Sequence, residues 1–226
     1  PNVVITGVTA NQVTMSWAPG STESSWDLAY RPANGAWTNV GSSAFAYYSL
    51  ANLQPNTTYD FLIISNCGNN ADTAEVTATT DCAVISAYPY VESFDTYSTD
   101  ETSAINPCWY RFTDNSTVTP YVVNTHANGG TNSFYWYKNS GNFAYVVLPT
   151  FDRNVNQLQL TFDLFRVDTL YPDNLLIGVM TDREDINTFT QLGSFTPNTA
   201  NEWQSFELLL NQYQGQGQYI AIVAPQ

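Results

Sequence analysis

Residues that could carry catalysis are present, but their types and spacing point away from an active site. His126 is the only histidine, and it lies in the run Thr-His-Ala-Asn-Gly-Gly. A single histidine without a paired cysteine or a serine elbow forms neither a catalytic triad nor a zinc site. We therefore interpret it as a solvated loop residue. The sequence also contains no phosphate-binding glycine loop and no His-Glu-x-x-His motif.

Paired carboxylates are the remaining route to catalysis, because the chain carries 20 acidic residues. A two-carboxylate glycosidase needs acids that face each other across a cleft, one of them with a raised pKa. The close Glu-x-Asp-x-x-Glu spacing that some glycosidases use is missing from the sequence. We therefore predict that the chain is not an enzyme.

Aromatic side chains are the better candidates for function, as ligand-binding residues. Residues 134–137 form the run Phe-Tyr-Trp-Tyr. On a strand, alternate side chains face opposite ways, so two of the four could be exposed. Exposed aromatic side chains stack on sugar rings or anchor protein contacts. We select Trp136 and Tyr137 as ligand-binding candidates, together with Trp37. The alternatives are that the run lies in core and interface, and that Trp37 contacts the neighbouring domain.

The charge balance excludes several classes of partner. The 20 acidic residues outnumber 6 basic ones, for a net charge of −14, and both halves of the chain are acidic. No basic patch is available to neutralise a phosphate backbone or an anionic lipid surface. No apolar stretch approaches the roughly 20 residues that a membrane-spanning helix needs. We therefore expect a monomer that binds no nucleic acid and does not insert into a membrane.

Length and apolar pattern predict two all-β domains. The chain has 226 residues, which exceeds the usual size of one domain. Short runs of alternating apolar residues, separated by turn residues, indicate strands of β-sandwiches. Such alternation in the first domain is clearest at Val13, Met15 and Trp17, and at Trp26, Leu28 and Tyr30.

The first domain has a tryptophan at position 17 and the run Leu-Gln-Pro-Asn-Thr-Thr-Tyr at residues 53–59. By these features residues 1–81 resemble a fibronectin type III domain, because Trp17 stands where that family has its core tryptophan and the run matches the family's Leu-x-Pro-x-Thr-x-Tyr. In that run the tyrosine hydroxyl bonds back to the backbone of the preceding corner. The resemblance implies an immunoglobulin-like sandwich in which Trp17 and Tyr59 are core residues.

After a linker at residues 82–87, the second domain contains four motifs: Pro-Tyr-Val-Glu-Ser-Phe-Asp at 89–95, Pro-Cys-Trp at 107–109, Leu-Pro at 148–149 and Leu-Leu-Ile-Gly-Val-Met-Thr-Asp at 175–182. By these motifs residues 88–226 resemble the choice-of-anchor J domain, which is related to cleaved-adhesin domains of gingipain-type proteases and more loosely to MAM domains. Eight to ten expected strands indicate a jelly-roll β-sandwich. The Asp-Asp-Ile strand that usually ends this domain is absent, so we expect a fragment.

The resemblance also implies a metal. Modules of this kind often hold a structural Ca²⁺, which takes six to eight oxygen ligands. Glu92 and Asp95, at the start of the second domain, are the candidate side-chain ligands. Asp182, Glu184 and Asp185 are closer together in sequence, but residues 181–185 are more simply a polar turn between strands.

Three cysteines allow one disulfide and a remaining thiol. Cys67 and Cys82 follow successive strands of an antiparallel hairpin, so they should lie roughly 25 Å apart at about 3.3 Å per residue. That distance far exceeds the ~7 Å Cα limit for a disulfide. Cys82 with Cys108 remains plausible, and three reduced thiols are the alternative. Cys67 could pair with a segment outside this sequence.

Together these features predict a non-catalytic binding or adhesion module of a secreted or outer-membrane-anchored bacterial surface protein, with glycan or host protein as its target. The alternatives are an accessory region of a larger secreted protease or glycosidase, and a structural spacer.

Overall fold

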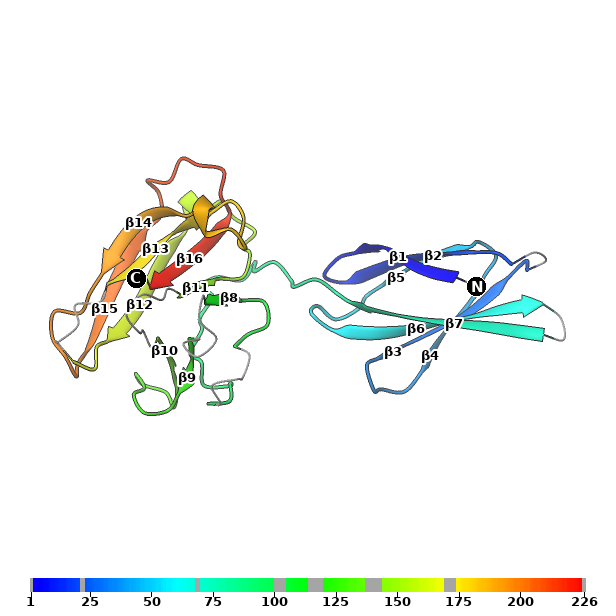
Figure 1. The fold of residues 1–226 in the computed structure, drawn as a ribbon, viewed down its shortest axis with the longest axis horizontal. Coiled ribbons are helices and arrows are strands. Elements are labelled where there is room, and N and C mark those ends of the chain that lie inside the picture. The colour runs from blue at the N-terminus through cyan, green and yellow to red at the C-terminus, as the bar shows by residue number, and fades with distance from the viewer. Residues whose placement is uncertain are drawn as a thin grey trace. The chain divides into compact units, whose positions relative to one another are not determined.

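The computed structural model describes residues 2–20, 23–67, 70–99, 105–113, 120–136, 144–168 and 174–224. The chain divides into two compact units, Pro1–Ala83 and Val84–Gln226. Both units are built from β-strands (Figure 1), which confirms the predicted all-β fold class.

The first unit is a sandwich of two antiparallel sheets (Figure 1). One sheet has the order β1-β2-β5, and its strands are Asn2–Val8, Gln12–Ala18 and Tyr47–Ala51. The other has the order β4-β3-β6-β7, and its strands are Thr38–Ser43, Trp26–Pro32, Thr58–Cys67 and Asn70–Thr79. Alternating apolar side chains from both sheets meet in one core, made of Val13, Met15, Trp17, Trp26, Leu28, Leu53, Tyr59, Phe61 and Ile63.

Tyr59 and Trp17 occupy the places that the sequence predicts. Tyr59 is buried, and the backbone N–H of Gln54 donates to its hydroxyl oxygen at 2.9 Å. This bond ties the corner before β6 to the core. Trp17 is buried and meets the Trp26 ring edge-on, with 5.7 Å between ring centroids. Both roles are confirmed.

The second unit contains a five-stranded antiparallel sheet of order β14-β13-β16-β11-β8. Its strands are Thr190–Phe195, Leu175–Met180, Tyr219–Ala224, Ala144–Val147 and Tyr110–Thr113. The described residues of this unit also form two ribbons: β12 (Gln159–Phe165) with β15 (Trp203–Leu209), and β9 (Tyr121–Val123) with β10 (Ser133–Tyr135). The short 3₁₀ helices η1 and η2 are Val155–Gln157 and Ile186–Thr188.

The five-stranded sheet is covered on both faces. Val146, Ile177 and Val179 belong to the larger core, in which Leu160 and Phe162 of β12 also pack. On the other face Tyr145 and Met180 form a second buried cluster, reached by Ile186 of η2. This double burial explains why β11 and β13 are apolar at consecutive positions rather than alternating.

The segment of residues 82–88 carries a disulfide and several hydrogen bonds. Cys82 and Cys108 form a disulfide, as predicted. Ile85 makes a parallel bridge with Phe151, and its N–H donates to the Thr150 carbonyl at 2.8 Å. The Tyr88 hydroxyl donates to the Asp152 carboxylate at 2.7 Å. The segment is therefore fixed at Cys82 by a covalent bond, and at Ile85 and Tyr88 by hydrogen bonds.

Candidate functional site

A row of polar side chains crosses the outer face of the β4-β3-β6-β7 sheet. Arg31 on β3 is directly opposite Asp60 on β6, and Asp60 is directly opposite Thr77 on β7. Side chains that are directly opposite share one face of a sheet. The residues before Arg31 and Asp60, Tyr30 and Tyr59, pack in the core, so alternation directs the row outward.

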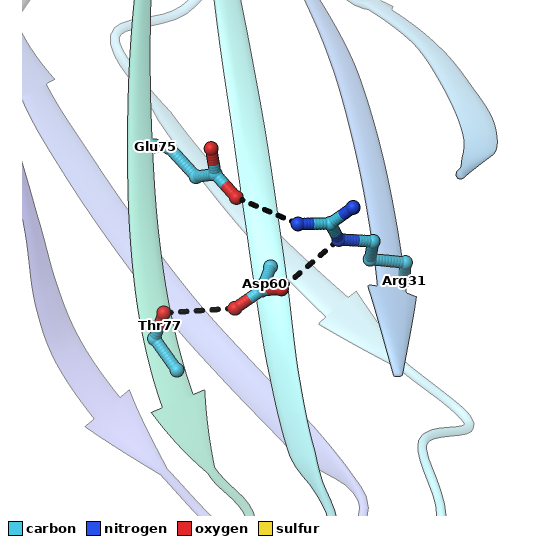
Figure 2. Close-up of polar contacts among 4 residues, drawn as sticks. All are labelled: Arg31, Asp60, Glu75 and Thr77. Carbon is cyan, nitrogen blue, oxygen red and sulfur yellow. Dashed lines mark hydrogen bonds and ion pairs between the residues drawn. The ribbon is translucent and has the colours of Figure 1, made fainter. Parts of the chain in front are cut away.

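Ion pairs and hydrogen bonds fix the guanidinium of Arg31 in this row (Figure 2). Its Nε donates to Oδ2 of Asp60 at 3.0 Å, and its Nη2 donates to Oε1 of Glu75 at 3.3 Å. The Thr77 hydroxyl donates to Oδ1 of Asp60 at 2.9 Å. The Thr77 hydrogen bond and, next, the Arg31 bond lower the pKa of Asp60. Because the Arg31 and Glu75 side chains are 30% and 49% exposed, the network contributes little stability and serves mainly to hold Arg31 in place.

Trp37 extends the row on the side of β4. Tyr30 pairs with Thr38, the first residue of β4. Because the two strands are antiparallel, Trp37, the residue before Thr38, lies beside Arg31, the residue after Tyr30. The Arg31 Cζ atom lies 4.4 Å from the centroid of the Trp37 ring, within the range of a cation–π contact. Trp37 remains 38% exposed. The result is a surface tryptophan positioned by a guanidinium that two carboxylates hold.

The aromatic run at residues 134–137 is only partly on the surface. Trp136 is half-buried and meets Phe134 edge-on, with ring centroids 5.5 Å apart. Phe134 stacks on Phe94 at 5.3 Å, and both belong to the margin of the larger core. Tyr137 lies outside the described residues. A ligand-binding role for Trp136 and Tyr137 stays a prediction.

Glu92 and Asp95, the predicted calcium ligands, are occupied by hydrogen bonds from the protein. Oδ1 of Asp95 accepts from the backbone N–H groups of Thr131 at 2.7 Å and Asn132 at 2.9 Å, and these bonds lower the pKa of Asp95. Glu92 accepts from the Tyr97 hydroxyl at 2.9 Å. Burial and, next, this carboxylate raise the pKa of Tyr97 to about 12.

Nothing else in the described ranges suggests a metal centre or a membrane span. Those ranges contain no group of three or more His, Cys, Asp or Glu residues placed to hold a metal ion. No helix in the part of the chain that the structure describes is long and apolar enough to cross a bilayer. Calcium at Glu92 and Asp95 stays a prediction that these observations do not test.

Sequence reasoning selected Trp37 but missed the residues that position it. Arg31 and Asp60 each follow a tyrosine that packs in the core, and this spacing is the available signal that they face outward. Their contact with each other depends on strand pairing across 29 residues of sequence. Alternation alone does not reveal such a pairing.

Comparison with known proteins agrees with the fold of the first unit. Residues 1–80 match the family described as the fibronectin type III domain. The first unit is therefore a fibronectin type III domain, as its core tryptophan and corner tyrosine predict. No curated protein sequence matches the chain.

Among solved structures, the chain is similar to several β-sandwich proteins. One is a computationally redesigned β-sandwich protein, with 24% identity over 36% of this chain and 92% of that one, and a TM-score of 0.33. Another is the fibronectin type III domain of the human collagen α1(XX) chain, with 19% identity over 38% and 86%, and a TM-score of 0.34. The twitchin kinase region of C. elegans shares 23% identity over 45% of this chain and 18% of that one, with a TM-score of 0.31.

Proposed function

We propose that the chain is a non-catalytic binding region of a secreted or surface-attached bacterial protein, and that its first domain contacts an extracellular protein through Trp37 and Arg31. Fibronectin type III domains are generally extracellular binding or spacer modules. The disulfide between Cys82 and Cys108 fits an oxidising, extracellular compartment.

One observation supports a binding role over a spacer role: Trp37 is exposed on a strand-flanking position while its ring is held by Arg31. Tryptophan and arginine are the side chains most enriched in interaction hot spots. A side chain that is already positioned loses less conformational freedom when a partner binds. The neighbouring acids Asp60 and Glu75 give this surface a mixed charge, which suits a protein partner better than a neutral sugar.

The second domain is proposed to be an adhesin-like jelly roll, with Trp136 and Tyr137 as a further contact and with a structural Ca²⁺ at Glu92 and Asp95. These assignments extend the sequence resemblance. Glycans are the second proposed class of target for the same adhesive role, with Trp136 and Tyr137 as the contact residues.

The test is a binding survey with the whole 226-residue chain. The chain is passed over a panel of purified extracellular-matrix and plasma proteins by biolayer interferometry, and over a glycan array. Saturable binding to at least one protein of the panel, which Trp37→Ala weakens by about tenfold or more, is the expected result. The matched control is Leu209→Ala, which removes a similarly exposed apolar side chain from the second domain. Protein binding that Trp37→Ala leaves intact, or binding to no protein on the panel, would contradict the proposal.

A further inference from the structure

The other sheet of the first domain presents a face with no charged side chain. Its outward residues are Asn2, Val4 and Thr6 on β1, Gln12, Thr14 and Ser16 on β2, and Tyr47, Ser49 and Ala51 on β5. None of these side chains is ionisable at neutral pH, although the chain has a net charge of −14. Hydroxyl and amide groups dominate the face, and the Thr14 and Ser49 hydroxyls bond to each other at 2.9 Å.

An exposed aromatic pair lies at the β5 edge of this uncharged face. Phe45 is 65% exposed and Tyr47 is 58% exposed, with 5.7 Å between ring centroids and 35° between ring planes. Val4, which is 50% exposed, pairs with Ser16, and Ser16 pairs with Tyr47. The row from Val4 to Tyr47 therefore spans two strand spacings, roughly 10 Å, with a hydroxyl between two apolar side chains.

The backbone that carries the pair is fixed to the core. The buried Ser43 hydroxyl donates to the Phe45 carbonyl at 3.0 Å and accepts from the Phe45 N–H at 3.1 Å. The N–H of Trp17, a core residue of β2, donates to the Ala46 carbonyl at 3.0 Å. Tyr47 itself is in the β5 ladder. The backbone at these exposed aromatic residues is thus ordered before any ligand arrives, which lowers the entropic cost of binding.

We propose that this face, with Phe45 and Tyr47 as its aromatic contacts at the β5 edge, binds a neutral polysaccharide. The C–H face of a sugar ring packs on an aromatic ring, whose exposed side is apolar. Serine and threonine hydroxyls each donate one hydrogen bond and accept two, so Ser16, Thr14 and Ser49 keep capacity for sugar hydroxyls. A sulfated or uronic-acid polymer would meet no cation among the outward residues of these strands, in a strongly acidic chain.

This proposal does not depend on the Trp37 surface, because the two lie on different sheets of the first domain. Protein binding at Trp37 could be absent while this face still binds sugar. Sugar binding could equally be absent while Trp37 still binds a protein. Separate variants on the two sheets therefore distinguish the two failures.

The test is native affinity electrophoresis of the whole chain in gels that contain soluble neutral polysaccharides: xyloglucan, galactomannan, mixed-linkage β-glucan and dextran. We expect at least one of them to retard the chain. Phe45→Ala and Tyr47→Ala should each raise the dissociation constant by about tenfold or more, whereas Tyr47→Phe, which keeps the ring, should not. Trp37→Ala should bind as the unaltered chain does.

Three results would overturn the proposal: retardation by none of the four polymers, retardation that both alanine variants retain, or equal retardation by polygalacturonate or heparin. Self-association in sedimentation velocity that Tyr47→Ala abolishes would instead assign the face to a second copy of the chain. Because both aromatic side chains are largely solvent-exposed, the variants should melt within a few degrees of the unaltered chain. Loss of binding in both single variants at an unchanged melting temperature would therefore reflect the loss of the aromatic side chains and not unfolding.

Discussion

Removing the disulfide should destabilise the second domain and leave the first unchanged. Cys82 and Cys108 enclose 25 residues, and most of these belong to the second unit. Closing a loop of that length lowers the entropy of the unfolded chain by an amount equivalent to about 3.5 kcal/mol at 25 °C. For a unit of this size, that loss corresponds to a fall in melting temperature of roughly 10 °C.

The assay is hydrogen–deuterium exchange followed by mass spectrometry across a urea series, because it reports the two domains separately. In Cys82→Ala/Cys108→Ala, peptides from β11, β13 and β16 should become unprotected at lower urea, while peptides from β2 and β6 should not change. A reducing agent applied to the unaltered chain should produce the same shift, and it should not affect the double variant.

Two outcomes would refute this reasoning. Equal loss of protection in both domains would show that the bridge stabilises the first domain as well. No loss in either would show that the bridge does not restrict the unfolded chain as the loop-closure argument requires.

Three further predictions concern single side chains. Tyr59→Phe leaves the Gln54 N–H without its acceptor and should lower the free energy of unfolding of the first domain by about 1–2 kcal/mol in urea titrations; an unchanged midpoint would contradict it. Asp60 has a lowered folded-state pKa, so its contribution to stability should be present above its unfolded pKa of about 3.9 and lost as pH falls through the folded pKa. The melting temperature of the unaltered chain should therefore fall toward that of Asp60→Asn below pH 4, and a constant difference would refute this. Gly130→Ala places a methyl group against the Asp95 carboxylate that Thr131 and Asn132 hold, and should cost the second domain about 1 kcal/mol; equal stability would show that Asp95 moves freely.

The core of the first domain was predictable because its signals are local. Tyr59 and the corner at Gln54 lie within one seven-residue motif, and Trp17 lies in a strand with strict alternation. The disulfide between Cys82 and Cys108 agrees with the sequence prediction, because strand geometry excludes one competing pair, Cys67 with Cys82. In the second domain, consecutive apolar residues such as those of β13 are typical of a strand that is covered on both faces, and the structure covers β13 in this way.

The functional surfaces were less predictable because they depend on pairing between distant segments. Arg31 meets Glu75 across 44 residues of sequence, and this contact depends on the register of β3 and β7 against β6. The aromatic run shows another limit: alternation correctly places Phe134 and Trp136 on one side, but it does not say which side is buried. Phe45 is in a turn, where no periodicity distinguishes an exposed aromatic side chain from a buried one.

The most direct test of the binding role is hydrogen–deuterium exchange of the whole chain with and without the tightest-binding protein from the survey. The account predicts added protection in β3, β4 and the turn that joins them, around Arg31 and Trp37. Protection confined to the second domain, or none at a saturating concentration of that protein, would contradict it.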